Sequence, residues 1–335
     1  MPQSKADPAE GTLPPVRPIT TEAIEAARSR IARTIQRTPL VKLQLTDDFP
    51  EIYLKLENLQ PINSFKLRGA ANAVAMLPEE RRSQGVWTIS AGNAGQGVAY
   101  AARAAGVPCT VVTIETAPET KVARMRALGA RIVKASFDAC WEAMDRRAFP
   151  GVAGTFVHPF DDEDFIAGNA TMGLEIVEDL PEVEMVIAAI GGGGLVTGVA
   201  CGVRAHKPNV RVYGAESETA APAALSFARG QASEFPAWQG TFIDGSGGKS
   251  VFPRMWERMR PVVDGSIVVT LDETKNAMRV LAEKARVIAE GAGALPVAAA
   301  LRQKRDCGPI VAVVSGGNID LTTFFELIGA TSSRS

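Results

Sequence analysis

The stretch "EMVIAAIGGGGLVTG", residues 184–198, decides the fold of this chain. Its first half is a continuous apolar run, typical of a strand that is buried on both faces of a parallel sheet. Four successive glycines then separate this strand from a helical pattern, "VACGVRAH", at 199–206. A strand, a tight turn and a helix in this order form part of a βαβ unit. We therefore expect an α/β protein.

The same alternation of strand and helix patterns continues on both sides of this stretch. Helical patterns begin at Thr21 and Ser64 and recur at 98–106, at 118–129 and, with a glycine-rich interruption, at 272–301. The predicted strands lie at 52–57, 85–90, 109–114, 130–135, 184–190, 210–216 and, ending in a glycine turn, within 308–320. Alternation with short connections predicts right-handed crossovers and parallel sheets with helices on both faces.

Composition excludes several classes of protein. The 335 residues are 46% hydrophobic and 22% charged with a net charge of −1, which gives no electrostatic basis for binding nucleic acid or an anionic membrane. No apolar run reaches membrane-spanning length. Residues 1–20 lack the apolar core of a signal peptide, so we predict a disordered arm there. Four cysteines without a C-x-x-C pair predict reduced thiols in the cytoplasm, and two histidines exclude a His-rich metal site.

Four polar or glycine-rich turns follow predicted strands. They lie at Pro61–Ser64, Ser90–Gly97, Gly191–Gly194 and Ser315–Asn318. Ligands of open α/β sheets bind at the carboxyl ends of the strands. We expect the four turns to meet at one crevice.

The glycine turn at 191–194 favours a phosphate site. Glycines let backbone N–H groups approach an anion closely, and the helix that follows adds a favourable field. The alternatives are a tight packing turn, which needs fewer glycines, and a dinucleotide site. The dinucleotide spacing G-x-G-x-x-G fails at Thr197, although Glu216 ends the next strand at a suitable distance for a ribose.

Lys66, in "NSFKLRGA" (63–70), lies at the start of a predicted helix whose N-cap would be Ser64. The positive end of a helix disfavours a cation. Desolvation and this helix end would both lower the pKa of Lys66 and favour the neutral, nucleophilic amine. An aldehyde cofactor that carries a phosphate would use Lys66 for an imine and the glycine turn for its phosphate. The alternative is a solvated lysine paired with Glu57 or another carboxylate.

The sequence alone does not decide the roles of two further turns, at 90–97 and 315–320. "SAGNAGQG" (90–97) offers the Ser90 hydroxyl, the Asn93 amide and backbone N–H groups at a helix start, which suit a carboxylate. An Asx-type turn that caps the helix is an equal alternative. In "SGGNID", Ser315 could simply satisfy a backbone group.

Six ordered motifs between about Thr38 and Asp320 resemble those of the serine/threonine dehydratases, which are pyridoxal-phosphate enzymes of fold type II, the tryptophan-synthase β type. The motifs are "LKLENLQPINSFKLRGA" (54–70), "SAGNAGQGVAYAA" (90–102), "HPFDDEDFIAG" (158–168), "GGGGLVTG" (191–198), "EGAGA" (290–294) and "SGGNID" (315–320). The resemblance implies two open parallel-type sheets with helices on both faces and an active site in the interdomain crevice. It also implies a large cofactor-binding domain (21–84 and 161–335) and a small mobile substrate-side domain (85–160).

The resemblance assigns roles to individual residues. Lys66 and Ser90 are the predicted catalytic residues, and Lys66 forms an imine with pyridoxal 5'-phosphate. Phe65 packs beside the pyridine ring, Asn93 bonds the cofactor's 3-hydroxyl, and Ser315 faces the ring nitrogen. The predicted phosphate ligands are Gly191, Gly192, Gly193, Gly194 and Leu195. The predicted substrate-carboxylate loop comprises Ser90, Ala91, Asn93 and Ala94.

The reaction that the resemblance implies is a β-elimination. The freed amine of Lys66 removes the α-proton of a 3-hydroxy L-amino acid, the β-hydroxyl leaves, and the product hydrolyses to a 2-oxo acid and ammonia. A neutral Ser315 holds less charge in the ring than an aspartate would, which favours loss of the leaving group. The substrate would be threonine, serine or a bulkier analogue such as phenylserine, and the protein a cytoplasmic homodimer.

Three positions depart from the family pattern. Ala91 stands where racemases of the family carry a serine that acts as a second acid. Ala94 replaces a histidine, and either Met172, Phe160 or the substrate's β-substituent would fill the space. Pro222 replaces an acidic metal ligand near Glu216, so we predict no metal. The alternative functions are a nicotinamide-dependent dehydrogenase and a non-catalytic amino-acid-binding protein.

Overall fold

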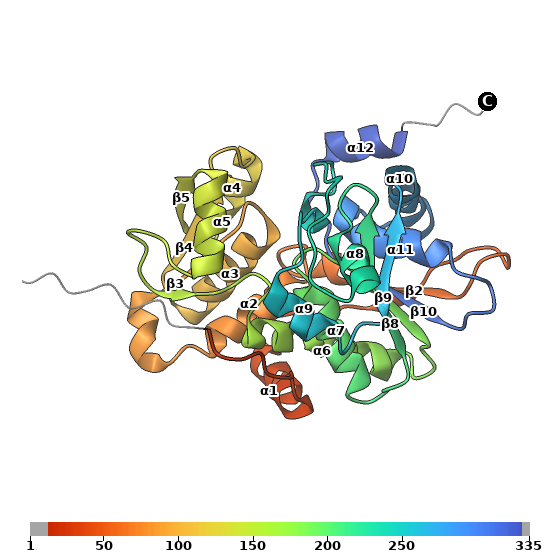
Figure 1. The fold of residues 1–335 in the computed structure, drawn as a ribbon, viewed down its shortest axis with the longest axis horizontal. Helices are drawn as coiled ribbons and strands as arrows, with labels where there is room; N and C mark the ends of the chain where they lie inside the picture. The colour runs from red at the N-terminus through yellow and green to blue at the C-terminus, as the bar shows by residue number, and fades with distance from the viewer. Residues whose placement is uncertain (1–12, 330–335) are drawn as a thin grey trace, which may run out of the picture.

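The computed structural model describes residues 13–329 as an α/β protein with two separate sheets (Figure 1). The larger sheet has the order β1-β2-β10-β7-β8-β9. Its strands are β1 (Leu40–Lys42), β2 (Ile52–Leu56), β7 (Met185–Ala189), β8 (Arg211–Ser217), β9 (Gly265–Val269) and β10 (Ile310–Val314). All neighbours pair in parallel except β1, which runs antiparallel to β2. The predicted parallel sheet is therefore confirmed, with one antiparallel strand at its edge.

The smaller sheet has the order β5-β4-β3-β6 and is parallel throughout. Its strands are β3 (Val86–Ile89), β4 (Cys109–Ile114), β5 (Arg131–Ala135) and β6 (Thr155–Phe156). Helices α3 (Asn93–Ala105), α4 (Glu119–Ala127) and α5 (Phe137–Arg146) cover it, and Figure 1 shows this unit on the left. All four strands fall between 85 and 160; the division of the chain into two domains remains a prediction.

The apolar run at 184–190 became β7 because it is buried on both faces. Met185, Ile187 and Ala189 belong to one core, in which they join α11 (Gly291–Leu301) and α10 (Leu271–Val280). Val186 and Ala188 point the other way, into a core shared with α7 (Gly194–Arg204). Side chains alternate along a strand, so a strand covered on both faces needs apolar residues at every position.

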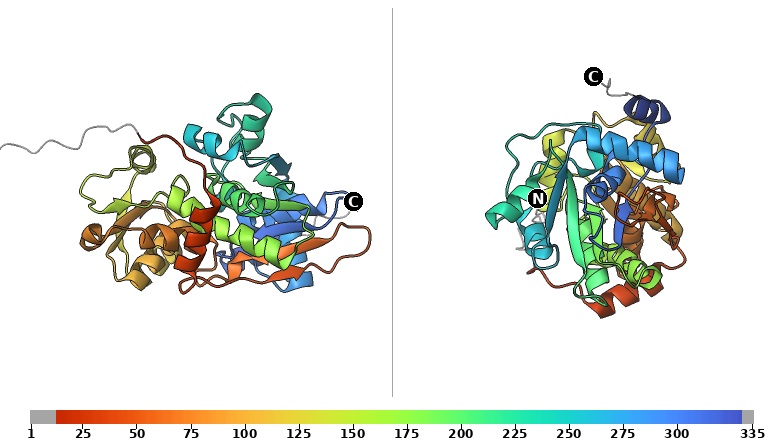
Figure 2. Two further views of the ribbon diagram at one scale, coloured as in Figure 1. Left: turned by 90° about the horizontal axis from the view of Figure 1, so that it is seen from below. Right: turned by 90° about the vertical axis from the view of Figure 1, so that its right-hand side faces the viewer.

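The remaining helices pack against the larger sheet or, through residues such as Ala70, Ala71 and Val74, into the core of the smaller one. They are α1 (Thr21–Ile31), α2 (Lys66–Ala75), α6 (Glu163–Asp179), α8 (Pro222–Arg229), α9 (Pro253–Met259) and α12 (Leu321–Gly329). The short elements are the 3-10 turns η1 (Glu57–Leu59), η2 (Glu79–Gln84) and η3 (Asp244–Ser246) and the π-helical turn η4 (Leu281–Ala285). Helix α1 contacts α2 and α6 where the two parts of the molecule meet (Figure 2).

Most sequence predictions of secondary structure are confirmed, with two corrections. The long helical pattern at 272–301 is interrupted as expected, but the break follows a π-helical turn and precedes the glycines, which lie within α11. The helix predicted from Ser64 begins instead at Lys66. Residues 1–12 of the predicted arm lie outside the described residues. Residues 13–20 form no helix or strand, and the carbonyls of Pro14 and Arg17 accept hydrogen bonds from Arg254 and Arg258. No helix within 13–329 is long and apolar enough to cross a membrane.

Candidate active site

A cavity of about 490 Å³ lies between the two sheets, and three of the four predicted turns line it; the Pro61–Ser64 turn does not, although Ser64 bridges to Gly316 of the Ser315–Asn318 turn. Every site residue predicted from the sequence lines it. These residues are Phe65, Lys66, Ser90, Ala91, Asn93, Ala94, Gly191, Gly192, Gly193, Gly194, Leu195 and Ser315. The cavity has the size of a typical small-molecule site. The structure thus brings all the predicted residues together, while their individual roles remain predictions.

Lys66 is the first residue of α2, and its amine faces the cavity. The N-cap is Phe65, which provides no side-chain cap, and the Ser64 hydroxyl only accepts a 3.4 Å bond from the Lys66 backbone N–H. The predicted Ser64 N-cap is therefore wrong. Lys66 Nζ donates to the Pro159 carbonyl at 2.6 Å.

No carboxylate within residues 13–329 pairs with Lys66; Glu57, the alternative partner predicted from the sequence, binds Arg68 instead. The Lys66 amine lies 5.1 Å and 5.4 Å from the ring centroids of Phe65 and Phe165. Desolvation lowers the pKa of Lys66 to about 8. An unpaired amine with a lowered pKa is well suited to act as a nucleophile and as a base.

The glycine turn forms an anion cradle at the N-terminus of α7. The backbone N–H groups from Gly191 to Leu195 have no acceptor in the part of the chain that the structure describes. Gly193 has φ +89°, a left-handed conformation that suits glycine, and it provides no side-chain cap. Successive N–H groups at the positive end of a helix are a fitting site for a phosphate.

Packing also restricts the side chains of this turn. A Cβ at Gly192 would lie 2.3 Å from a ring carbon of Phe160, and one at Gly194 would lie 2.7 Å from the Phe160 carbonyl. A Cβ at Gly191 would likewise lie 2.9 Å from the Gly245 carbonyl oxygen, so the packing interpretation is correct for three of the four glycines. This packing still leaves the N–H groups of these glycines without acceptors, so the turn can be both a tight packing turn and a phosphate site.

Asn93 joins a chain of polar side chains instead of capping a helix. Its Nδ2 donates to Glu290 Oε1 at 2.7 Å, and its Oδ1 accepts from Asn318 Nδ2 at 2.8 Å. The N-cap of α3 is Gly92, which has no side-chain bond, and the Gly92 N–H donates to the Ser90 hydroxyl at 3.0 Å. The Ser90 hydroxyl thus closes a local side-chain turn, but no side chain caps α3 as the Asx-turn alternative required. Hydrogen bonds on both sides hold the Asn93 amide at the cavity wall.

Glu290 is a cavity residue to which the sequence analysis gave no role. It precedes α11, is only 6% exposed, and receives one hydrogen bond, from Asn93. Its second oxygen has no partner among residues 13–329. Burial raises the pKa of Glu290 to about 7, with a further rise from Asp244, while the bond from Asn93 opposes the shift. The signal was present in "EGAGA", where an acidic residue precedes small ones at a helix start.

Ser315 follows β10 directly, at the cavity wall. Its carbonyl accepts the Phe65 N–H at 3.0 Å, which ties it to the Lys66 turn. Its side chain is buried, and its hydroxyl has no hydrogen-bond partner in the described range. The alternative in which this hydroxyl satisfies a backbone group is therefore wrong. A free, neutral hydroxyl is suited to face a ring nitrogen.

Glu216 lies away from the cavity. Its carboxylate accepts the N–H groups of Ala223 at 2.9 Å and Ala224 at 2.7 Å and the Ser266 hydroxyl at 2.7 Å, so it caps α8. It cannot serve as the ribose ligand of a dinucleotide at the glycine turn. Residues 13–329 contain no cluster of three His, Cys, Asp or Glu side chains that could hold a metal. The phosphate cradle, the unpaired amine and the free hydroxyl together fit pyridoxal phosphate.

Comparison with known proteins agrees with this fit. The family model described as pyridoxal-phosphate dependent enzyme matches residues 31–316. The chain belongs to this family. It is 41% identical over 315 residues to the L-threonine ammonia-lyase of Thermotoga maritima, covering 92% of this chain and 78% of the relative.

Two solved structures of the family share the fold of this chain. The structure of maize serine racemase matches with a TM-score of 0.86 at 33% identity, covering 92% of this chain and 97% of the other. The structure of a threonine deaminase from T.th. matches with a TM-score of 0.81 at 34% identity, covering 90% of this chain and 99% of the other. The predictions of fold type II, of the cofactor and of the dehydratase family are confirmed.

Proposed function

We propose that this protein is a pyridoxal-phosphate dependent ammonia-lyase that converts a 3-hydroxy L-amino acid to a 2-oxo acid and ammonia. The observation that carries this proposal is the unpaired Lys66 amine, which opens into the same cavity as the uncapped N–H groups of Gly191–Leu195. The name of the T. maritima relative gives the same activity for threonine.

Different residues of the cavity would have different roles in this reaction. Bound pyridoxal phosphate supplies the electron sink that takes up the negative charge when Cα loses its proton. The N–H groups of the glycine turn would hold its phosphate, and the Ser315 hydroxyl would meet its ring nitrogen without adding charge. Lys66, whose pKa is lowered by desolvation, is the base for the α-proton. The loop from Ser90 to Ala94 would bind the substrate carboxylate.

Ala91 favours elimination over racemisation, although serine racemases are among the structural relatives. Racemisation requires a second acid that can protonate the opposite face of Cα, and the Ala91 methyl at the cavity wall has no proton to give. We therefore expect the holoenzyme to form pyruvate from L-serine in deuterated water with little D-serine. D-serine formed at a rate comparable to that of pyruvate would contradict this assignment.

The activity itself is tested with purified holoenzyme and L-threonine, L-serine and L-threo-phenylserine. Release of ammonia and of the matching 2-oxo acid in equal amounts is expected for at least one of them. A protein that shows the visible absorption of bound cofactor but releases no 2-oxo acid from any of the three would be a binding protein instead.

We also propose that the enzyme acts in the cytoplasm as a homodimer. The four cysteines Cys109, Cys140, Cys201 and Cys307 are all unpaired, as a reducing compartment would keep them. Sedimentation equilibrium of the holoenzyme should give twice the mass of the chain; a single-chain mass would refute the dimer.

A further inference from the structure

Three aromatic rings form a row along one wall of the cavity. The ring centroids of Phe160 and Phe252 lie 5.4 Å apart, and those of Phe252 and Trp141 lie 5.2 Å apart. The rings come from three separate segments: Phe160 from the loop before α6, Phe252 from the N-cap of α9, and Trp141 from α5. All three line the cavity. We call this set the aromatic wall.

The aromatic wall runs from the anion cradle to the cavity mouth. At its inner end the Phe160 ring packs against Gly192 of the cradle. At its outer end Trp141 is 41% exposed, although it stacks on Phe137 with centroids 6.0 Å apart. A large aromatic surface left uncovered inside a cavity gains free energy when a ligand covers it.

The neighbouring wall offers little to a polar substituent. Ile114 and Pro118 line the same cavity, and the charged side chains Lys121 and Asp244 pair with each other. The polar side chains left on this side are the hydroxyls of Ser246 and Ser250. A charge on the far end of a substrate would therefore lose its hydration without an unpaired opposite charge to replace it, and this side of the cavity is mainly apolar.

Space near the carboxylate loop is consistent with a large substituent. The methyl group of Ala94 lines the cavity. Of the two side chains predicted from the sequence to fill the space beside it, Met172 is buried in a different core, with Val196 and Val199 of α7. Phe160 does line the cavity, and its ring packs on Gly192 as part of the aromatic wall.

We propose that the substrate carries an aryl group on its β-carbon and that Trp141 and Phe252 are specificity-determining residues that contact this ring. The proposal rests on the proposed function and names its substrate class: β-aryl 3-hydroxy L-amino acids. Elimination then yields an aryl-substituted 2-oxo acid and ammonia, with the same bonds broken as for threonine. Aromatic contacts of this kind are worth a factor of about three to ten in affinity.

Binding is tested separately from turnover with L-phenylalanine and L-alanine, neither of which has a leaving group on Cβ. Each is titrated into the holoenzyme and followed by the change in the visible cofactor spectrum and in tryptophan fluorescence. We expect L-phenylalanine to bind at least about tenfold more tightly than L-alanine. Trp141→Leu should weaken the binding of L-phenylalanine by about three- to tenfold and leave the affinity for L-alanine unchanged.

Phe49→Leu is the matched control, because the Phe49 ring is similarly exposed at 40% but does not line the cavity. It should change neither affinity. Phe252→Leu provides a second test at the middle of the wall, should Trp141→Leu fail to fold. Equal binding of L-phenylalanine and L-alanine by the unmodified protein would overturn the proposal whatever the variants do.

Turnover separates this proposal from the proposed function. We expect kcat/KM for L-threo-phenylserine to exceed that for L-threonine, and Trp141→Leu to lower only the former. If threonine is preferred, and Trp141→Leu affects both substrates equally, the wall only packs the two parts of the molecule together and the aryl proposal is wrong. If no 3-hydroxy amino acid is turned over, the lyase proposal fails, and the binding experiment still decides what the wall recognises.

Discussion

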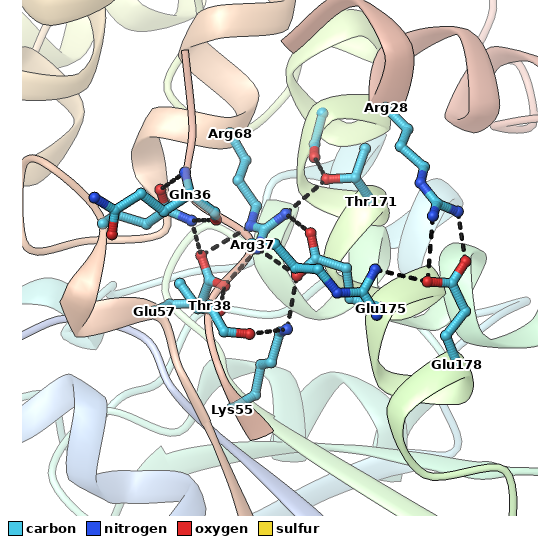
Figure 3. Close-up of polar contacts among 12 residues, drawn as sticks. Arg28, Gln36, Arg37, Thr38, Lys55, Glu57, Arg68, Thr171, Glu175 and Glu178 are labelled. Atoms are coloured by element: carbon cyan, nitrogen blue, oxygen red, sulfur yellow. Dashed lines mark hydrogen bonds and ion pairs between the residues drawn. The ribbon is translucent and has the colours of Figure 1, made fainter. Parts of the chain in front are cut away.

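Helix α2 carries two cations only two residues apart, and their surroundings are opposite in kind. Arg68 is 0% exposed and lies between two carboxylates: it donates to Glu57 at 2.8 and 2.9 Å and to Glu175 at 2.7 and 2.8 Å (Figure 3). Lys55, also 0% exposed, donates to Glu175 at 2.6 Å. We call these four side chains the ionic cluster. Its two positive and two negative charges balance.

Two charged side chains of the cavity, Lys66 and Glu290, have no charged partner among residues 13–329. Lys66 meets only the Pro159 carbonyl, and Glu290 meets only the Asn93 amide, among the residues that are described. Desolvation therefore lowers the pKa of Lys66 and raises that of Glu290. Burial alone would raise the pKa of Glu57 as well, but the charge and hydrogen bonds of Arg68 outweigh it and lower that pKa. Pairing thus outweighs burial for Glu57 in the cluster, although desolvation still lowers the pKa of Lys55 there, whereas Lys66 and Glu290 in the cavity have no charged partner to offset their burial.

The choice of arginine in the ionic cluster and lysine in the cavity agrees with the different surroundings of the two side chains. The planar guanidinium of Arg68 presents several N–H donors in a fixed fork, which two carboxylates can satisfy at once. The Lys66 amine is a single point that can lose its proton when it is desolvated. The cluster joins α2 to β2, η1 and α6, and the loop before α6 provides the Pro159 carbonyl that receives Lys66. A rigid, paired region thus holds a reactive, unpaired one in place.

The largest effect is expected for Lys66→Ala. Turnover should fall by a factor of about 10³ or more, because both the attachment point and the base are lost, while stability changes little. Borohydride reduction followed by mass spectrometry should attach the cofactor to Lys66 in the unmodified protein. Lys275→Ala, on the surface of α10, is the control and should keep activity. A cofactor adduct on any other lysine would disprove the assignment.

Arg68→Met should be the most destabilising of the changes considered. It leaves two buried carboxylates with only Lys55 to compensate them, which should lower the free energy of unfolding by about 3–5 kcal/mol. Urea unfolding measures the change. The matched variant is Arg28→Met, which breaks the exposed pair with Glu178 and should cost about 1 kcal/mol at most. Equal losses in the two variants would mean that the cluster does not differ from a surface ion pair.

Sequence reasoning succeeded where the signal was local. The apolar run of β7 and the turn glycines could be recognised from neighbouring residues, because burial on two faces and close backbone approach leave marks at fixed spacing. The ionic cluster could not be found in this way. Its members come from β2, η1, α2 and α6, and only the packed fold shows that Arg68 and not Lys66 binds Glu57. The motif "EGAGA" marks Glu290 locally, but its role in the cavity was missed because its partner Asn93 is 197 residues away.

The rate of cofactor uptake by the apoprotein should depend on pH through Lys66. Only the neutral amine attacks an aldehyde, and a pKa of about 8 means that its neutral fraction rises about fifty-fold between pH 6 and pH 8 and then levels off. Stopped-flow measurement of the visible band after addition of pyridoxal phosphate tests this. An ordinary lysine would give rates that still rise about tenfold per pH unit at pH 9. That result would place Lys66 in a solvated environment like any surface amine.

The smallest expected effect is that of Glu290→Gln in the cavity, which we compare with Glu57→Gln in the ionic cluster. The folded-state pKa of Glu290 is raised to about 7, so the folded apoprotein binds a proton more tightly than the unfolded chain does. Stability is then lost as the pH rises from about 4.5 to 7, and a neutral amide escapes that loss. Glu290→Gln should therefore stabilise the apoprotein by about 1–2 kcal/mol at pH 8 and change its stability little at pH 5.

Glu57→Gln should change the stability in the opposite direction. The pKa of Glu57 is lowered, so its stabilisation is present at pH 8 and disappears as the pH falls below about 4.5; its loss should cost about 3 kcal/mol at pH 8. Urea unfolding of both variants at the two pH values decides the matter. If Glu290→Gln destabilises the protein at pH 8, the cavity carboxylate has a partner of its own, and the contrast between the two regions disappears.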